Sequence, residues 1–304
     1  MREIDESDAL LLALVTNRGS GQTVASLVSE VLTDGVNDVW RERFPPDLLG
    51  SAHDDLLERA SDEVRDWRVK GYRFTSILRA DYPRRLRSVH DAPPFLFYRG
   101  ELGVVQSGGI SVVGSRDASP EGTQRAADVA RHLVERQIAV ISGLARGIDF
   151  AAHTAALEAG GVALGVIASG IAGTYTPASS RDLHDAVAAR GALVSQFWPS
   201  AHALRHTFLQ RNATMSGLGF ATFVIEAGET SGARAQARLA MQHGRPVILT
   251  DRVVERTQWG RALADGQRAN VHVVTSRAEM HDAVSLVTRT TSLSTLDDML
   301  VASL

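Results

Sequence analysis

Cysteine is absent from the 304-residue sequence, and lysine occurs only once, at Lys70. Disulfides, thiolate zinc sites and cysteine nucleophiles are therefore excluded. The phosphate loop that requires Gly-Lys-Ser/Thr is excluded as well, because Lys70 lies between Val69 and Gly71. The sequence also lacks an apolar run of membrane-spanning length and, near its first residue, the apolar core of a signal peptide. We expect a cytoplasmic protein without membrane attachment.

The chain has no overall excess of positive charge, since its formal net charge at pH 7 is −3. A nucleic-acid site would therefore have to be a local patch. Nearly all of the positive charge is arginine, which holds phosphate through two N–H groups and stacks on bases, whereas lysine acts as a point charge. For most surface arginines, a composition bias of the genome is the preferred explanation.

The hydrophobic pattern changes twice along the chain. Residues 1–70 have helical spacing throughout, with Thr23 placed to cap one helix, and we predict a small helical N-terminal domain there. Residues 71–280 are predicted to form the main domain. Residues 281–304 are predicted to be a tail, Ser/Thr-rich at first and with a short helix from Ser294.

The main domain alternates apolar runs with helical patterns, after a start at 72–103 whose prolines and aromatics indicate two strands and an ordered loop. We predict strands at 110–113, 138–141, 163–167, 192–195, 222–225, 247–249 and 271–274, with helices at 120–136, 148–159, 180–189 and 233–243. Apolar strands that alternate with helices indicate a parallel sheet covered on both faces. The predicted fold class is α/β, a doubly wound, extended Rossmann-like parallel sheet.

Three turns at the carboxyl ends of these strands have the composition of anion sites. They are Gly114-Ser115-Arg116, the stretch from Ser142 and Gly143 through Arg146 and Gly147 to Asp149, and the stretch from Glu226 to Ser231 and Gly232. Each leads into a helix, so that backbone N–H groups and a helix N-terminus can face a negative charge. Because ligands of open α/β sheets bind at this edge, the three turns predict a groove suited to a polyanion backbone. Tight turns with solvated arginines are the plainer interpretation.

The segment 202–212 interleaves basic residues with one aromatic residue. A base can stack on Phe208 while Arg205 and Arg211 hold the flanking phosphates, as single-strand binding requires. The alternative is that Phe208 belongs to the core and the arginines are solvated. His202 and His206 are four residues apart, but no third ligand accompanies them, and we expect no metal.

Evidence for catalysis is sparse in the sequence. Asp149 and His153 can share a helix face, and Glu226 and Glu229 can form a carboxylate pair, but no nucleophile accompanies either pair. The Gly-x-Gly-x-x-Gly fingerprint of dinucleotide binding is missing after the first parallel strand, which is followed by Gly114-Ser115-Arg116-Asp117. We expect no catalytic residues and no cofactor.

Taken together, these motifs resemble the DprA/Smf family of bacterial DNA-processing proteins A. The resemblance covers roughly 71–245. It rests on Val113–Arg116, Ser142–Asp149 with His153, Tyr175-x-Pro177, Phe208-x-x-Arg211-Asn212, and Ser231-Gly232, together with Asp81-Tyr82-Pro83 and Asp91-Ala92-Pro93-Pro94 upstream. Their order and spacing carry the resemblance more than any one motif does.

The resemblance implies a non-enzymatic protein that binds single-stranded DNA on an extended Rossmann fold and forms a homodimer through that fold. It further implies loading of the RecA recombinase, and a role in recombination, competence and natural transformation. Arg116 would correspond to a DNA-binding arginine of the family, and Arg205, Phe208, Arg211 and Asn212 to its basic and aromatic segment.

The sequence departs from the family pattern at several positions. Gln196 stands where a glutamate is usual, Ala213 where an arginine is usual, and Thr250-Asp251 where Pro-Gly is usual. The final ~25 residues are too few for the C-terminal winged helix of many members. We therefore expect a divergent member whose partner is RecA or a genetically linked protein, and whose pathway is recombination, phage defence or toxin–antitoxin regulation.

Two other interpretations stay open at this point. The fold is similar to that of nucleoside-monophosphate phosphoribohydrolases of the LOG type. If the chain were such an enzyme, it would be a nucleotide N-glycosidase and Glu226 would belong to its site. The chain could also be a regulatory protein with a vestigial pocket.

The leading hypothesis places phosphates and bases on a set of residues from the three turns and the basic segment: Gly114, Ser115, Arg116, Ser142, Gly143, Arg146, Gly147, Arg205, Phe208, Arg211, Asn212, Ser231 and Gly232.

Overall fold

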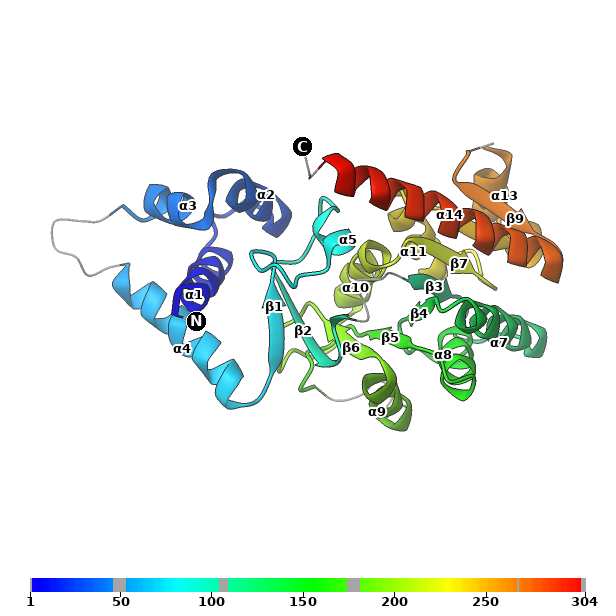
Figure 1. Ribbon diagram of the computed structural model, residues 1–304, viewed down its shortest axis with the longest axis horizontal. Coiled ribbons are helices and arrows are strands. Elements are labelled where there is room, and N and C mark those ends of the chain that lie inside the picture. Colours follow the sequence, from blue (N-terminus) through cyan, green and yellow to red (C-terminus); the bar gives the residue numbers. More distant parts are fainter. Residues whose placement is uncertain (1, 46–52, 104–108, 174–180, 267, 302–304) are drawn as a thin grey trace.

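The structure is a computed structural model that describes residues 2–45, 53–103, 109–173, 181–266 and 268–301 (Figure 1). Tyr175 and Pro177, which belong to one of the motifs above, lie outside the described residues. In the part of the chain that is described, every helix is too short or too polar to cross a membrane.

Four helices at the N-terminal end pack together beside the sheet, at the end of the molecule opposite β9 (Figure 1). They are α1 (Arg2–Thr16), α2 (Val24–Asp34), α3 (Val36–Arg43) and α4 (Asp54–Val69). The predicted cap is confirmed, because the Thr23 side chain accepts a hydrogen bond from the Ser26 N–H. Gly35, with φ of 91°, ends α2 in a backbone conformation that glycine adopts without strain.

One nine-stranded sheet organises the rest of the chain, in the order β1-β2-β6-β5-β4-β3-β7-β8-β9. The strands are β1 (Arg73–Ser76), β2 (Phe95–Gly100), β3 (Gly109–Val113), β4 (Ala139–Ser142), β5 (Ala163–Val166), β6 (Ala192–Ser195), β7 (Ala221–Val224), β8 (Val247–Thr250) and β9 (Val271–Val274). β3 to β9 are parallel, as their apolar sequences predict, and β2 joins them by pairing antiparallel with β6 and with β1.

Helices connect the strands and cover both faces of the sheet. They are α5 (Arg84–Arg87), α7 (Pro120–Glu135), α8 (Ile148–Glu158), α9 (Arg181–Arg190), α10 (Arg205–Leu218), α11 (Gly232–Gln242), α12 (Asp251–Arg256), α13 (Gln258–Asp265) and α14 (Arg277–Val301). On one face Ile110 and Val112 of β3 pack in a cluster with residues of α7, α8 and α14. On the other face Val113 and Val224 pack with residues of α10 and α11.

The direction of winding reverses between β3 and β7. From β3 the chain winds outward through β4, β5 and β6, then crosses back by way of α10 to β7 on the other side of β3. Val113 pairs with Val224 at the carboxyl ends of these two strands. Because the connections after β3 and β7 depart to opposite faces, a crevice opens between them, and open α/β sheets bind ligands at such points.

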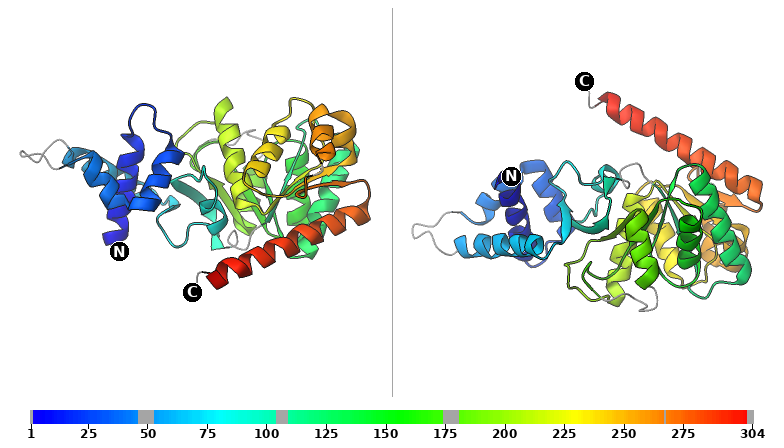
Figure 2. Two further views of the ribbon diagram at one scale, coloured as in Figure 1. Left: turned by 90° about the horizontal axis from the view of Figure 1, so that it is seen from above. Right: turned by 60° about the horizontal axis from the view of Figure 1, so that its bottom comes forward.

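Five helices differ from the expectations: α5, α12 and α13 form where no helix was predicted, and α10 and α14 differ as follows. The basic segment forms the 14-residue helix α10, which the hydrophobic pattern did not reveal because its buried positions include polar residues such as Thr207, Asn212 and Ser216. The tail is not a polar stretch with a short helix, since α14 runs unbroken for 25 residues. Val284 and Val287 are buried in the same cluster as α7 and fix its first half, and the second half projects from the body (Figure 2).

A buried ion pair fastens the N-terminal helices to the sheet. Asp8 of α1 is fully buried, and its carboxylate accepts hydrogen bonds from the Ser76 Oγ at 2.6 Å and from the Nε of Arg79 at 3.0 Å. Beside it, the Trp67 ring of α4 packs edge-on against Phe95 and Phe97 of β2. The helical unit and the sheet therefore share one continuous apolar core.

Replacement Asp8→Ala should lower the free energy of unfolding by about 3 kcal/mol, because it leaves the Arg79 guanidinium largely buried without its counter-charge. Urea denaturation followed by circular dichroism measures the change. Asp38→Ala is the matched control, since Asp38 forms an exposed pair with Arg41 and should leave the midpoint unchanged. Equal midpoints for the two variants would contradict this account of the junction.

Candidate nucleic-acid interface

A cavity of about 730 Å³ opens at the carboxyl ends of β3 and β7, at the reversal of winding. Four segments that are distant in sequence form its wall: the turn after β3, the turn after β4, α10 with the residues before it, and the start of α11. The lining residues are Val113, Gly114, Ser115, Arg116, Ala145, Asp149, Ala203, Leu204, Arg205, Phe208, Arg211, Asn212, Met215, Gly228, Thr230, Ser231, Gly232, Ala233 and Gln236. Nine of the thirteen predicted site residues are therefore brought together.

Arg116 and Phe208 meet at the exposed side of this cavity. The Arg116 guanidinium carbon lies 5.2 Å from the centroid of the Phe208 ring, within range of a cation–π contact. Arg116 is exposed and Phe208 is half-buried. Neither Arg116 nor the exposed Arg205 has an ion-pair partner among the described residues, so both charges are available to a ligand.

Arg211 lies beneath the cavity and is buried. Its Nη1 donates to the Val166 carbonyl at the end of β5 at 2.8 Å, and its Nε donates to the Asn212 side chain at 3.1 Å. Burial lowers the pKa of the Arg211 guanidinium, and the charge of Asp149 opposes that shift. Arg211 thus gives the floor of the cavity a positive charge while its Nε and Nη1 bind the protein itself.

The turn from Ser142 to Asp149 uses its own side chains and backbone to satisfy its donors. The Gly143 N–H donates to the Asp149 carboxylate at 3.1 Å, and the Ala145 N–H also bonds to it. The Ile148 N–H donates to the Ser115 carbonyl at 3.2 Å. Burial raises the pKa of Asp149, and its bonds to the Gly143 and Ala145 N–H groups and the charge of Arg211 oppose that shift. This turn therefore accepts an internal carboxylate where a phosphate was expected.

Four residues of the predicted site lie outside the wall that the described residues form: Ser142, Gly143, Arg146 and Gly147. The Ser142 hydroxyl donates to the Val112 carbonyl inside the sheet, and Arg146 pairs with the exposed Asp117 at 2.5 Å. These contacts let the four residues support the wall, and their contact with a ligand stays a prediction. Direct contact of Arg146 with DNA stays a prediction without structural support.

The start of α11 faces the cavity and makes fewer hydrogen bonds to the protein itself. The Ser231 hydroxyl caps the helix by accepting from the Ala233 N–H at 3.1 Å, and the Asn212 side chain donates to the Gly232 carbonyl at 3.4 Å. Gly232 is exposed and has open space around its Cα. The positive end of the α11 dipole thus adds to the arginines. The sequence had indicated this turn, but not the contribution of the neighbouring Gly228, Thr230 and Gln236.

Glu226 and His153, each considered above as one member of a catalytic pair, have structural roles. Both oxygens of Glu226 bind Ser119, one accepting from its N–H at 3.1 Å and the other from its hydroxyl at 2.6 Å, and Ser119 in turn caps α7. His153 is fully buried with Nε2 at 3.2 Å from the Leu164 carbonyl, and burial lowers its pKa to about 4. Glu226 is absent from the cavity wall, so the glycosidase interpretation is not favoured.

A possible metal-binding group lies elsewhere in the described residues. His90, Asp91 and His243 bring three ligand atoms within 4.8 Å of one another, whereas His202 and His206 belong to no such group there. None of these three residues lines the cavity between β3 and β7.

Comparison with known sequences places these features in a family. A family model described as DNA recombination-mediator protein A matches residues 73–285. The DNA processing protein DprA of Streptococcus pneumoniae is 38% identical over 173 residues, which cover 57% of this chain and 61% of that protein. The DNA processing protein DprA of Bacillus subtilis is 30% identical over 224 residues, which cover 73% of this chain and 74% of that protein. The chain thus spans less than two thirds of the pneumococcal relative in sequence.

Comparison with solved structures gives the same fold. The X-ray structure of the Streptococcus pneumoniae DNA processing protein A superposes with a TM-score of 0.65 and 26% identity, over 90% of this chain and 91% of that one. The DNA processing protein A of Helicobacter pylori, described for its single-stranded DNA binding mode, superposes with a TM-score of 0.61 and 18% identity, over 70% of this chain and 96% of that one.

The close approach of Gly143 to Arg211 provides a test of the cavity floor. A Cβ at Gly143 would lie 1.7 Å from the Arg211 Nη1, so Gly143→Ala should displace the guanidinium and lower the free energy of unfolding by about 2 kcal/mol. Gly232→Ala is the control, because its Cβ would meet nothing within 4 Å. Thermal denaturation of both variants gives the comparison, and a Gly143→Ala protein as stable as Gly232→Ala would refute the packing argument.

Proposed function

The chain belongs to the DNA recombination-mediator protein A family, the DprA/Smf proteins, and on that premise we propose that it binds single-stranded DNA in the cavity between β3 and β7. It acts in DNA processing during recombination and natural transformation, as a binding protein that catalyses no reaction. The observation that carries the proposal is the contact of an exposed arginine with a half-buried aromatic ring, Arg116 on Phe208, at the exposed side of that cavity.

The chemistry of the wall supports a polyanion with stackable bases. Arg116 and Arg205 supply exposed positive charge, and the start of α11 offers its dipole and the Ser231 and Gly232 backbone. Phe208 offers an aromatic face to a base, which every base can use because stacking is tolerant of sequence. Buried Arg211 adds charge from below without changing position. A strand with a phosphate at each nucleotide can contact several of these groups at once, which a mononucleotide cannot.

The proposal also covers the oligomeric state, the partner protein and the cellular location. We propose a homodimer formed through the Rossmann-like domain, a partner that is RecA or a genetically linked protein, and a cytoplasmic location. Family resemblance supports the first two points, and the cysteine-free composition supports the third.

Replacement Phe208→Ala should weaken binding to oligo-dT roughly tenfold, because a stacked base loses its aromatic partner at a cost of about 1–3 kcal/mol. Fluorescence anisotropy with a labelled dT oligomer measures the dissociation constant. Phe150→Ala is the matched control, since Phe150 is an exposed phenylalanine of α8 outside the cavity wall and should bind like the parent. Equal affinities for the Phe208 and Phe150 variants would remove Phe208 from the interface.

Replacement Arg116→Ala should weaken binding and flatten its salt dependence, with the slope of log K against log [salt] smaller by about 0.7 for each phosphate that the variant no longer neutralises. Titrations at several salt concentrations measure the slope. Arg131→Ala is the control, because Arg131 lies on α7 in a pair with Asp128. Arg146→Ala is a second comparison: a smaller slope would show that Arg146 contacts DNA, and a parent-like slope would show that its pair with Asp117 keeps it out of the interface. An unchanged slope for Arg116→Ala would overturn the assignment. An affinity of the parent protein that does not change with salt concentration would overturn it as well.

A further inference from the structure

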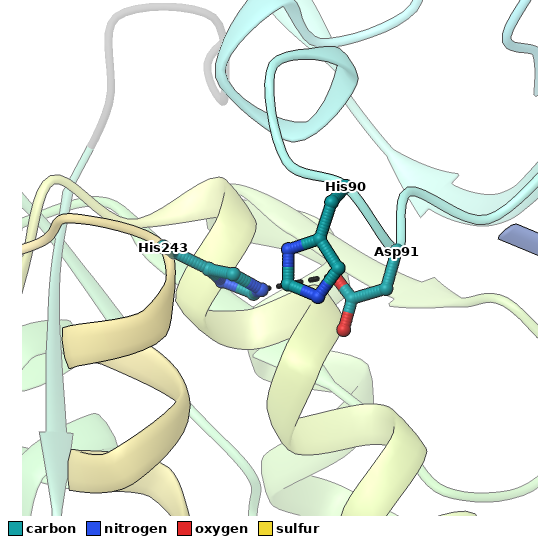
Figure 3. A group of neighbouring side chains, drawn as sticks. All are labelled: His90, Asp91 and His243. Atoms are coloured by element: carbon teal, nitrogen blue, oxygen red, sulfur yellow. Dashed lines mark hydrogen bonds and ion pairs between the residues drawn. The ribbon is translucent and has the colours of Figure 1, made fainter. Parts of the chain in front are cut away.

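Three ligand-type side chains converge where the loop before β2 meets the end of α11 (Figure 3). His90 and Asp91 belong to the loop between α5 and β2, and His243 is the residue that ends α11. The His243 Nε2 lies 2.9 Å from the Asp91 Oδ1, and the rings of His90 and His243 are 5.5 Å apart between centroids at an interplanar angle of 70°. All three ligand atoms fall within 4.8 Å of one another.

The buried member of this group is already held in a fixed orientation. The His243 side chain has no exposed surface, and its Nδ1 lies 3.0 Å from the Ser216 Oγ of α10. A histidine that binds a metal through Nε2 commonly donates its Nδ1–H to an oxygen, which fixes the tautomer and the ring. Ser216 occupies the place of such an outer partner.

We propose that His90, Asp91 and His243 bind one Zn²⁺ ion, with water as the fourth ligand. Two imidazole nitrogens and one carboxylate oxygen form a donor set that Zn²⁺ accepts in tetrahedral geometry, whereas Mg²⁺ and Ca²⁺ prefer oxygen alone. In the metal-bound form the Nε2 lone pair of His243 binds the ion, and the single ring proton lies on Nδ1, where it is donated to the Ser216 Oγ. The His90 ring, which is exposed, turns toward the ion to complete the set.

The location gives the site a structural role that is separate from DNA binding. α10 and α11 line the DNA cavity near their N-terminal ends, through Phe208 and Gly232, and the proposed ion lies at their C-terminal ends, through Ser216 and His243. The remaining ligands come from the loop that leads into β2. A bound ion would therefore tie this loop to both helices and stabilise the domain without touching the DNA cavity.

Zinc titration of the tag-free chain tests the proposal. Isothermal calorimetry should show one equivalent of Zn²⁺, and a hundredfold excess over the dissociation constant should raise the Tm by about 5 °C. Co²⁺, used as a spectroscopic substitute, should give the visible absorption of a four-coordinate site. No DNA is present, so the outcome is independent of the proposed function.

Two variants and one control locate the ion. His90→Gln changes an exposed residue and carries little risk for folding, and it should weaken Zn²⁺ binding at least tenfold. His243→Gln should abolish it. His272→Gln, on β9 and outside the group, is the control and should bind Zn²⁺ like the parent. Absence of saturable binding, or parent-like titration of His90→Gln, would overturn the proposal and leave a hydrogen-bonded His243–Asp91 pair.

Discussion

The geometry of the cavity depends on one buried cation, Arg211. A guanidinium in the interior is costly unless it is hydrogen-bonded and balanced by a negative charge. Here the Val166 carbonyl and the Asn212 side chain accept its hydrogen bonds, and the buried Asp149 supplies the balancing charge. These partners belong to β5, α10 and the turn after β4. The hydrogen bonds and the charge balance of Arg211 therefore fix three segments of the wall relative to one another. Asn212 extends the same network to α11 through the Gly232 carbonyl.

Asp149 has a matching effect on the turn that contains it. Its carboxylate binds the Gly143 and Ala145 N–H groups, which occupies the donors that such a turn offers to a phosphate in other proteins. The close contact between Gly143 and the Arg211 guanidinium leaves no room for a side chain there. The wall is therefore held on this side by internal contacts, and the proposal assigns anion binding chiefly to the turn after β3, the start of α10 and the start of α11.

The sequence predicted the sheet well, because buried parallel strands are continuous apolar runs, and the seven predicted parallel strands match β3 to β9 within a residue or two. It predicted Arg116 and Phe208 as site residues from separate motifs, although only the fold brings them to 5.2 Å. Other features have no local signal. α10 is buried partly through polar residues, so it lacks an apolar stripe. The pairing of Arg146 with Asp117 depends on how the turns after β4 and β3 approach each other.

The division between buried and exposed arginines bears on what the cavity can select. Buried Arg211 has two of its donors bonded to the protein, at Val166 and Asn212, whereas exposed Arg116 and Arg205 have no ion-pair partner among the described residues. Direct readout of a base edge needs donors and acceptors held at defined positions. The contacts proposed for this cavity are of another kind, with Arg116 and Arg205 on phosphates and Phe208 on the face of a base. Such contacts favour a binding mode that tolerates any sequence, depends on salt, and gains affinity from the number of nucleotides engaged.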